Sequence, residues 1–120
     1  MSYIQGFLQP VQENRKADYI ELARKSWALF KEYGAVSMCE AWGDSVPDGK
    51  LTSFPMAVKK TDDEVVVFSW IVWPDKETCE NCFEKMQEDT RWHDVMPKPD
   101  EAPFDMKRMI FGGFQPVFEG

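Results

Sequence analysis

Two cysteines three positions apart are the first residues in this sequence whose types and spacing could do chemistry. Cys79 and Cys82 come directly after a predicted strand, within the first turns of a predicted helix. A helix N-terminus favours thiolate, so this spacing resembles a dithiol redox motif. Both sulfurs, however, share a helical stripe with Phe83 and Met86, and free cysteine is commonly a small buried hydrophobe. We interpret the pair as buried and keep thiol redox chemistry as an alternative.

The histidine and the remaining cysteine add no recognisable site. His93 is the only histidine, so any Ser-His-Asp or Cys-His catalytic set would have to use it. Its neighbours Arg91 and Asp94 are polar, and we expect His93 to lie exposed to solvent. Zinc needs about four ligands, and Cys39 lies at no spacing that would complete such a set. We predict no metal and no cofactor.

Composition excludes several classes of protein. The 120 residues carry a formal net charge of -7, and the basic residues are scattered, so nucleic acid is not an expected partner. No apolar run approaches the roughly 18 residues of a membrane span. The first ten residues lack the basic region of a signal peptide. We expect one cytoplasmic domain over residues 1–120, with free thiols and without contact to a membrane.

The elements that must position any site follow from hydrophobic period. Alternation predicts strands, and the helical spacing of Ile20, Ala23, Trp27 and Phe30 predicts a helix from about Asn14 that stops at Gly34. Asp75 is a good N-cap for a second helix, and the proline-rich stretch 89–105 should be loop, with a short turn near 92–95. The expected strands are Tyr3–Pro10, Ala35–Gly43, Ser53–Lys60 and Glu64–Trp73 as a hairpin, and Lys107–Val117.

This order predicts an α+β fold of ferredoxin-like type, a split βαβ arrangement with an antiparallel sheet and both helices on one face. Residues 64–73 and 107–117 are apolar on both sides of the strand. Helices can cover only one of the two faces of the sheet. Each large side chain left in water forgoes roughly 1.5 to 3 kcal/mol of burial. We therefore expect a second copy of the chain to cover the other face, in a homodimer.

A family resemblance is carried by four stretches of the chain, Cys39–Lys50, Met56–Lys59, Val67–Ile71 and Pro103–Phe114. They resemble the uncharacterised bacterial YbaA-like family. The resemblance implies the dimeric α/β barrel superfamily, in which two ferredoxin-like sheets pack face to face around a cavity, and it implies no established activity. That superfamily includes haem-degrading enzymes with a late histidine ligand, which keeps haem at Trp92-His93 as a minor alternative. Cys79, Cys82 and His93 do not look like family features.

Glu40 and Arg108 are the candidates for a catalytic role. Alternation places Glu40 between Met38 and Trp42, on a face that we assign to the dimer cavity, while the small residues on the other face should lie beneath the helices. A carboxyl in such a cavity needs a partner, which Arg108 or Lys59 could supply, and its pKa moves without one. A structural salt bridge is the competing interpretation.

Several aromatic side chains on the strands are candidates for contact with a ligand, or for simple core packing. They are Trp42, Phe68, Trp70, Phe111 and Phe114. Three functions follow. The leading one is binding or conversion of a small apolar or aromatic molecule in the cavity of a homodimeric barrel. The alternatives are a non-catalytic dimeric interaction protein, favoured by a filled cavity, and a thiol redox protein, which requires exposed sulfurs with a lowered pKa.

Overall fold

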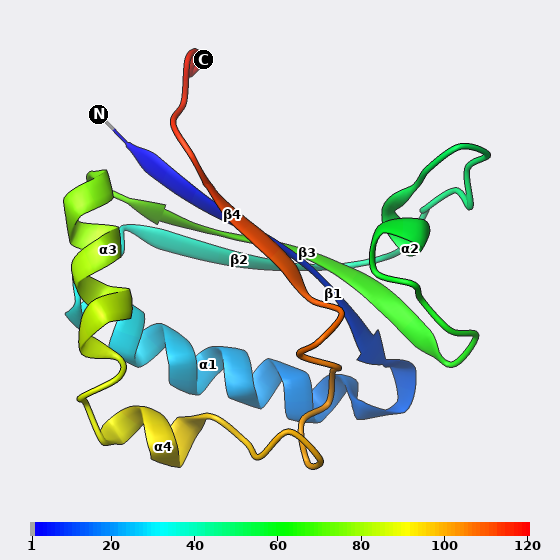
Figure 1. Cartoon of the computed structure of the whole chain (residues 1–120), viewed down its shortest axis with the longest axis horizontal. Coiled ribbons are helices and arrows are strands. Elements are labelled where there is room, and N and C mark those ends of the chain that lie inside the picture. The colour runs from blue at the N-terminus through cyan, green and yellow to red at the C-terminus, as the bar shows by residue number, and fades with distance from the viewer. Residues whose placement is uncertain (1) are drawn as a thin grey trace.

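The computed structural model describes residues 2–120, in which helices α1, α3 and α4 lie on one side of a four-stranded sheet (Figure 1). The strands are β1 (Tyr3–Gln12), β2 (Ser37–Trp42), β3 (Glu64–Trp73) and β4 (Ile110–Phe114). The helices are α1 (Lys16–Glu32), α2 (Phe54–Ala57), α3 (Lys76–Lys85) and α4 (Arg91–Val95), and a 3-10 turn, η1 (Glu13–Arg15), precedes α1. No helix among residues 2–120 is both long and apolar enough to cross a membrane.

The strand order confirms the predicted ferredoxin-like topology. The sheet has the order β2-β3-β1-β4, and each neighbouring pair is antiparallel. The central pair, β1 and β3, is in register over its full length, from Tyr3 opposite Trp73 to Gln12 opposite Glu64. The last strand, β4, is shorter than predicted and pairs only with β1. β2 and β4 are therefore the two edges of the sheet.

The two long helices begin and end for identifiable reasons. The side chain of Asp75 accepts a hydrogen bond from the backbone N–H of Thr78 at 2.7 Å, which is the predicted N-cap of α3. Gly34, at φ +108°, ends α1 in a conformation that side chains disfavour. The buried stripe of α1 differs by one position from the prediction, because Tyr19 is buried whereas Ile20 is 46% exposed.

The predicted strand Ser53–Lys60 is wrong, and the segment forms the short helix α2 instead. The hydroxyl of Ser53 accepts a hydrogen bond from the backbone N–H of Met56 at 3.1 Å, which caps a helical turn. Pro55 has no N–H to give to a sheet and suits the first turn of a helix. Lys59 has φ 51°, a left-handed conformation that no strand contains. The sheet consequently has four strands rather than the five that we expected.

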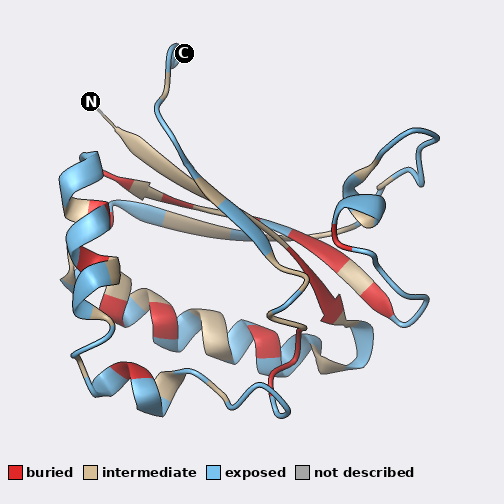
Figure 2. Cartoon of the chain, in the orientation of Figure 1, coloured by how far each residue is buried: buried red, intermediate tan, exposed pale blue. Residues whose placement is uncertain are grey.

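The helix-facing side of the sheet carries two separate clusters of buried apolar residues. One surrounds Trp73 and Trp92 and includes Leu29 of α1 together with both cysteines of α3. The other surrounds Val11, Tyr19 and Phe104. Buried residues lie along β3, at the end of β1 and along α1, whereas β4 and the C-terminal segment are largely exposed (Figure 2).

Arg108 fixes the chain as it enters β4. Its guanidinium forms two hydrogen bonds with the Glu64 carboxylate, at 2.8 and 2.6 Å, and a third with Asp105 at 2.9 Å. It also donates to the carbonyl of Lys59 at 2.8 Å. Glu64 is buried at the start of β3, and the Arg108 guanidinium holds the pKa of its carboxyl below the usual range. The network joins β3, the segment after α2 and the approach to β4.

Replacing Arg108 with Met should lower the free energy of unfolding at pH 7 by about 2 to 4 kcal/mol, because a buried carboxylate loses its partner. The pKa of Glu64 is lowered by folding, so the pair stabilises the fold above the unfolded pKa of about 4.3. That contribution is lost as the pH falls through the folded value. The difference in the free energy of unfolding between wild type and Arg108→Met should therefore be smaller at about pH 3 than at pH 7.

Urea unfolding followed by tryptophan fluorescence at both pH values measures this difference. Arg24→Met is the matched control, because Arg24 pairs with Glu21 on the exposed side of α1. That pair should contribute less than about 1 kcal/mol. Equal stabilities of Arg108→Met and wild type at pH 7 would show that the network is not structural.

Candidate functional site

A pocket lies between the sheet and helices α1, α3 and α4, where the two apolar clusters fail to meet. Its volume is about 290 Å³, and residues of both clusters line it. Two small residues in the middle of α1, Ala23 and Ser26, form part of the wall and leave this space unfilled. The hydroxyl of Ser26 already donates to the carbonyl of Leu22 at 2.8 Å. The sequence of α1 therefore creates the cavity through small side chains at its centre.

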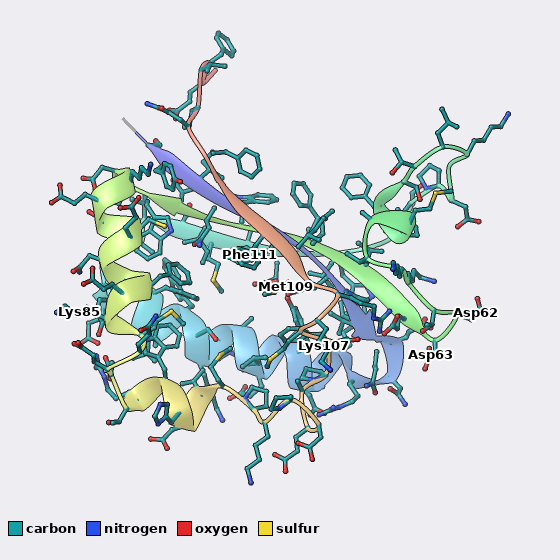
Figure 3. All side chains as sticks on the ribbon, in the orientation of Figure 1. Asp62, Asp63, Lys85, Lys107, Met109 and Phe111 are labelled. Carbon is teal, nitrogen blue, oxygen red and sulfur yellow. The ribbon has the colours of Figure 1, made fainter. Side chains whose placement is uncertain are left out.

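Methionine supplies much of the apolar lining. Five of the chain's seven methionines face the pocket, together with phenylalanine side chains from β1, α1, α3 and the segment before β4. Methionine is flexible and polarisable, and it adapts to apolar surfaces of different shape. Met109 lies just before β4 on the helix-facing side of the sheet (Figure 3). The five are Met38, Met86, Met96, Met106 and Met109.

A chain of hydrogen bonds forms the polar part of the pocket. The amide of Gln9 on β1 donates to the hydroxyl of Tyr19, and that hydroxyl donates to Oε1 of Glu40 on β2 at 2.5 Å. Ser69 on β3 also donates to Glu40. Gln9, Tyr19 and Ser69 are buried, whereas Glu40 belongs to an edge strand and is exposed. The chain thus runs from the interior to a carboxyl on the edge strand β2.

The electrostatics of this group follow from its surroundings. The enclosing protein raises the pKa of Glu40 by removing part of its hydration, and the hydrogen bonds from Tyr19 and Ser69 act in the opposite direction. Burial, reinforced by the adjacent Glu40, raises the pKa of Tyr19 far above its ordinary value. Tyr19 therefore remains a hydrogen-bond donor at physiological pH, and Glu40 is the group whose protonation can change.

Two predictions about Glu40 are wrong. Glu40, Met38 and Trp42 do share one face of β2, but that face lies against α1 rather than in a cavity between subunits. Neither Arg108 nor Lys59 is its partner, because Arg108 binds Glu64 and Asp105. Within residues 2–120 no lysine or arginine forms an ion pair with Glu40.

The residues on the other side of β2 from Glu40 explain why the face of Glu40 was assigned wrongly. The small residues of β2 lie on the open side, where Cys39 is the register partner of Trp70 and Ala41 that of Phe68. Large and small side chains therefore alternate across neighbouring strands of the open face. The small size of Cys39 and Ala41 reflects the bulk of these cross-strand neighbours rather than a helix above them.

The predicted aromatic ligand contacts do not form one site. Trp42 packs against Tyr19 on the helix-facing side, with a ring-centroid distance of 6.5 Å. Phe68 and Trp70 pack against each other on the open face, with a ring-centroid distance of 5.4 Å. Phe111 lies on β4 near Phe7 and lines a second cavity, of about 430 Å³, beside α3 (Figure 3). It also borders the hollow on the open face that Phe68 and Phe114 line. Phe114 belongs to the open face, where it approaches Gly6 and Gly112.

The structure does not meet the requirements of the thiol redox alternative. Cys79 and Cys82 are buried in the cluster around Trp73, as we interpreted them, and all three cysteines are free. Burial raises the pKa of the Cys79 thiol to about 11 and that of Cys82 to about 12. Both shifts disfavour thiolate, the reactive form. His93 is exposed on α4, as expected.

In residues 2–120 no group of three or more histidine, cysteine, aspartate and glutamate side chains is placed to hold a metal ion.

Sequence reasoning missed most of the residues that make this pocket. Tyr19 had a readable signal, because Tyr19, Leu22, Ser26 and Leu29 follow the same spacing as the stripe that we selected. Gln9 had a weaker signal, as a polar residue on the apolar side of a strand.

Solved structures with similar folds support the topology. A NIPSNAP family protein from Agrobacterium tumefaciens aligns with a TM-score of 0.59 and 10% identity, covering 98% of this chain and 94% of that one. A mutant of SnoaB, a cofactor-independent oxygenase from Streptomyces nogalater, aligns with a TM-score of 0.56 and 12% identity, covering 98% and 95%. A putative antibiotic biosynthesis monooxygenase from Bacillus cereus gives 0.58 and 13%, covering 100% and 95%. At these identities the likeness shows the fold alone.

Sequence comparison shows the family. The uncharacterized protein YbaA of Escherichia coli strain K12 is 44% identical over 119 residues, which cover 99% of each chain. The YbaA protein of Shigella flexneri gives the same figures. Residues 2–106 match the family described as "Protein of unknown function (DUF1428)". The resemblance found in the sequence is confirmed, and the chain belongs to the DUF1428 family of proteins of unknown function.

Proposed function

We propose that this chain binds a small, largely apolar molecule in the pocket between its sheet and α1, with Glu40 and Tyr19 as the polar contact. The observation that carries the proposal is a carboxyl, without a cationic partner within residues 2–120, that lines a methionine-rich apolar cavity of about 290 Å³. That volume lies at the lower end for ligand sites, and a few placed polar groups in an apolar wall are typical of them.

Glu40 sets the polarity of the bound molecule. Tyr19 and Ser69 already donate to its carboxyl, and the remaining acceptor positions are available to a hydroxyl or N–H group of a ligand. A carboxylate with a raised pKa is also a suitable acceptor for a ligand's proton. The rest of the occupant must be apolar, because the other walls consist mainly of methionine and aromatic side chains.

We further propose that the protein is a homodimer whose interface is the open face of the sheet. Phe68 is 46% exposed there and Phe114 61% exposed, and Ile110 and Phe54 lie beside the same shallow hollow. Apolar patches of this kind mark interfaces in soluble proteins. The cytoplasmic location remains a prediction from the sequence.

The first test is ligand binding, with 2-naphthol as the probe because it combines an apolar bicycle with one hydroxyl donor. We expect saturable binding at one site per chain in isothermal titration calorimetry. Glu40→Gln should weaken binding about tenfold, because a hydrogen bond to a charged acceptor is replaced by a neutral one. The control Glu21→Gln lies on the exposed face of α1 and should bind like wild type. No saturable binding to wild type would refute the proposed function.

The second test measures the electrostatics of the site. In carbon-13 NMR titrations the Glu40 carboxyl should titrate above the range of ordinary glutamates. Tyr19→Phe should raise that pKa further, because it deletes a hydrogen bond that stabilises the charged form. Tyr33→Phe, which removes a tyrosine bonded to Asp89 instead, should leave the Glu40 titration unchanged. A Glu40 carboxyl that titrates normally would contradict the role assigned to the pocket.

The third test concerns the open face. Sedimentation at micromolar concentration should give twice the 14.0 kDa mass of the chain. Phe114→Asp should shift the protein to single chains, because a charge would be buried in the interface. Ile20→Asp is the control, since Ile20 is also exposed but lies on α1. Wild type that sediments as a single chain, or a Phe114→Asp variant that remains dimeric, would refute this interface.

A further inference from the structure

A second polar side chain contributes to the wall of the pocket. Trp92 of α4 lines the pocket and is only 2% exposed. Its indole Nε1 is the buried side-chain nitrogen in residues 2–120 that has no hydrogen-bond partner. Trp73, the neighbouring buried tryptophan, differs, because its Nε1 reaches Oε1 of Gln5 at 3.4 Å. An unpaired buried donor destabilises a fold, because it has lost its hydrogen bonds to water without replacement.

The side chains around Trp92 provide no strong acceptor. Its closest aromatic neighbour is Phe30, with ring centroids 4.9 Å apart, and a phenyl face accepts only weak hydrogen bonds. The other members of its cluster are mainly apolar or sulfur-containing. An indole N–H can donate but cannot accept. The group that would satisfy it must therefore bring an acceptor oxygen.

The two polar groups lie towards opposite ends of the pocket. Tyr19, which holds Glu40, is in the first turn of α1, whereas Phe30, which contacts Trp92, is in its last turn. Phe30 comes eleven positions after Tyr19, which corresponds to about 16 Å along the helix axis. Ala23 and Ser26 line the space between them.

We propose that the Nε1–H of Trp92 is a second ligand-binding group, which donates to a carbonyl or ether oxygen of the bound molecule. This inference rests on the proposed function of the pocket and names the class of its ligand. The occupant is an elongated, apolar, aromatic-type molecule with a hydroxyl at the Glu40 end and an acceptor oxygen at the other. Such a ligand satisfies the Glu40 acceptor and the buried donor together.

Matched probes that differ only in the acceptor oxygen test this assignment. One pair is 2-naphthol and 6-hydroxy-2-naphthaldehyde, and a longer pair is 4-hydroxybiphenyl and its 4′-carbaldehyde. In wild type at least one aldehyde should bind about three- to tenfold more tightly than its parent, as one additional hydrogen bond predicts. Trp92→Phe should remove this advantage. Trp73→Phe, which also shortens a buried tryptophan but outside the pocket lining, should retain it.

Nitrogen-15 NMR of the indole groups gives a readout in the wild-type protein, and a variant serves only to assign the signal. The five tryptophans give five indole signals, and the signal absent from Trp92→Phe identifies Trp92. Addition of the preferred aldehyde to wild type should move the Trp92 proton signal downfield, and the parent phenol should not.

The outcomes separate this inference from the proposed function. Phenols and aldehydes that bind wild type equally well, with the Trp92 signal unmoved, would refute the role of Trp92 and leave the pocket as a ligand site. An advantage of the aldehyde that persists in Trp92→Phe would likewise refute it. If no probe of either pair binds, the proposed function fails and this inference fails with it.

Discussion

The seating of α1 on the sheet is the constraint on which the rest of the structure depends. The first turn of the helix is held by polar contacts, because the Tyr19 hydroxyl meets Gln9 of β1 and Glu40 of β2. Its last turns are held by apolar contacts around Leu29 and Phe30. Between these two contacts the helix presents small side chains, so it spans the sheet without filling the space beneath it.

This arrangement assigns different physical tasks to the two sides of the sheet. The helix-facing side keeps an unfilled volume with a hydrogen-bonded carboxyl, whereas the open side carries exposed phenylalanines and a shallow hollow. Arg108 supports this division, because its bonds to Glu64 hold the segment that carries Met106 and Met109 beside the pocket. Packing against a partner and enclosure of a ligand therefore need not compete for the same residues.

The sequence predicted the topology well because alternation and capping are local. Period two along 3–10 and 64–73, the N-cap Asp75 and the stop at Gly34 all appear in the structure. The segment 53–60 was misjudged because its alternation resembles a strand, whereas the Ser53 cap and Pro55 favour a helix. The sequence therefore contained local signals for a helix in this segment, and they contradicted the strand-like alternation.

The site could be predicted only in part, because its geometry depends on contacts between distant elements. Alternation correctly grouped Met38, Glu40 and Trp42, but it cannot say which face a helix will cover. Placing the first residue of the α1 stripe at Ile20, one position too late, hid Tyr19, the residue that would have identified that face. The unpaired indole of Trp92 follows from packing across four elements and has no sequence signature.

The alternation of β3 has one more consequence. Phe68 and Ser69 are adjacent in sequence and point to opposite sides, so a single strand is a wall of both the pocket and the proposed interface. In a dimer joined through the open faces, the two pockets would lie on the outer sides of the assembly. A molecule could enter or leave either one without separation of the subunits. Any cooperativity between the pockets would have to pass through the thickness of both sheets, by displacement of β3 itself.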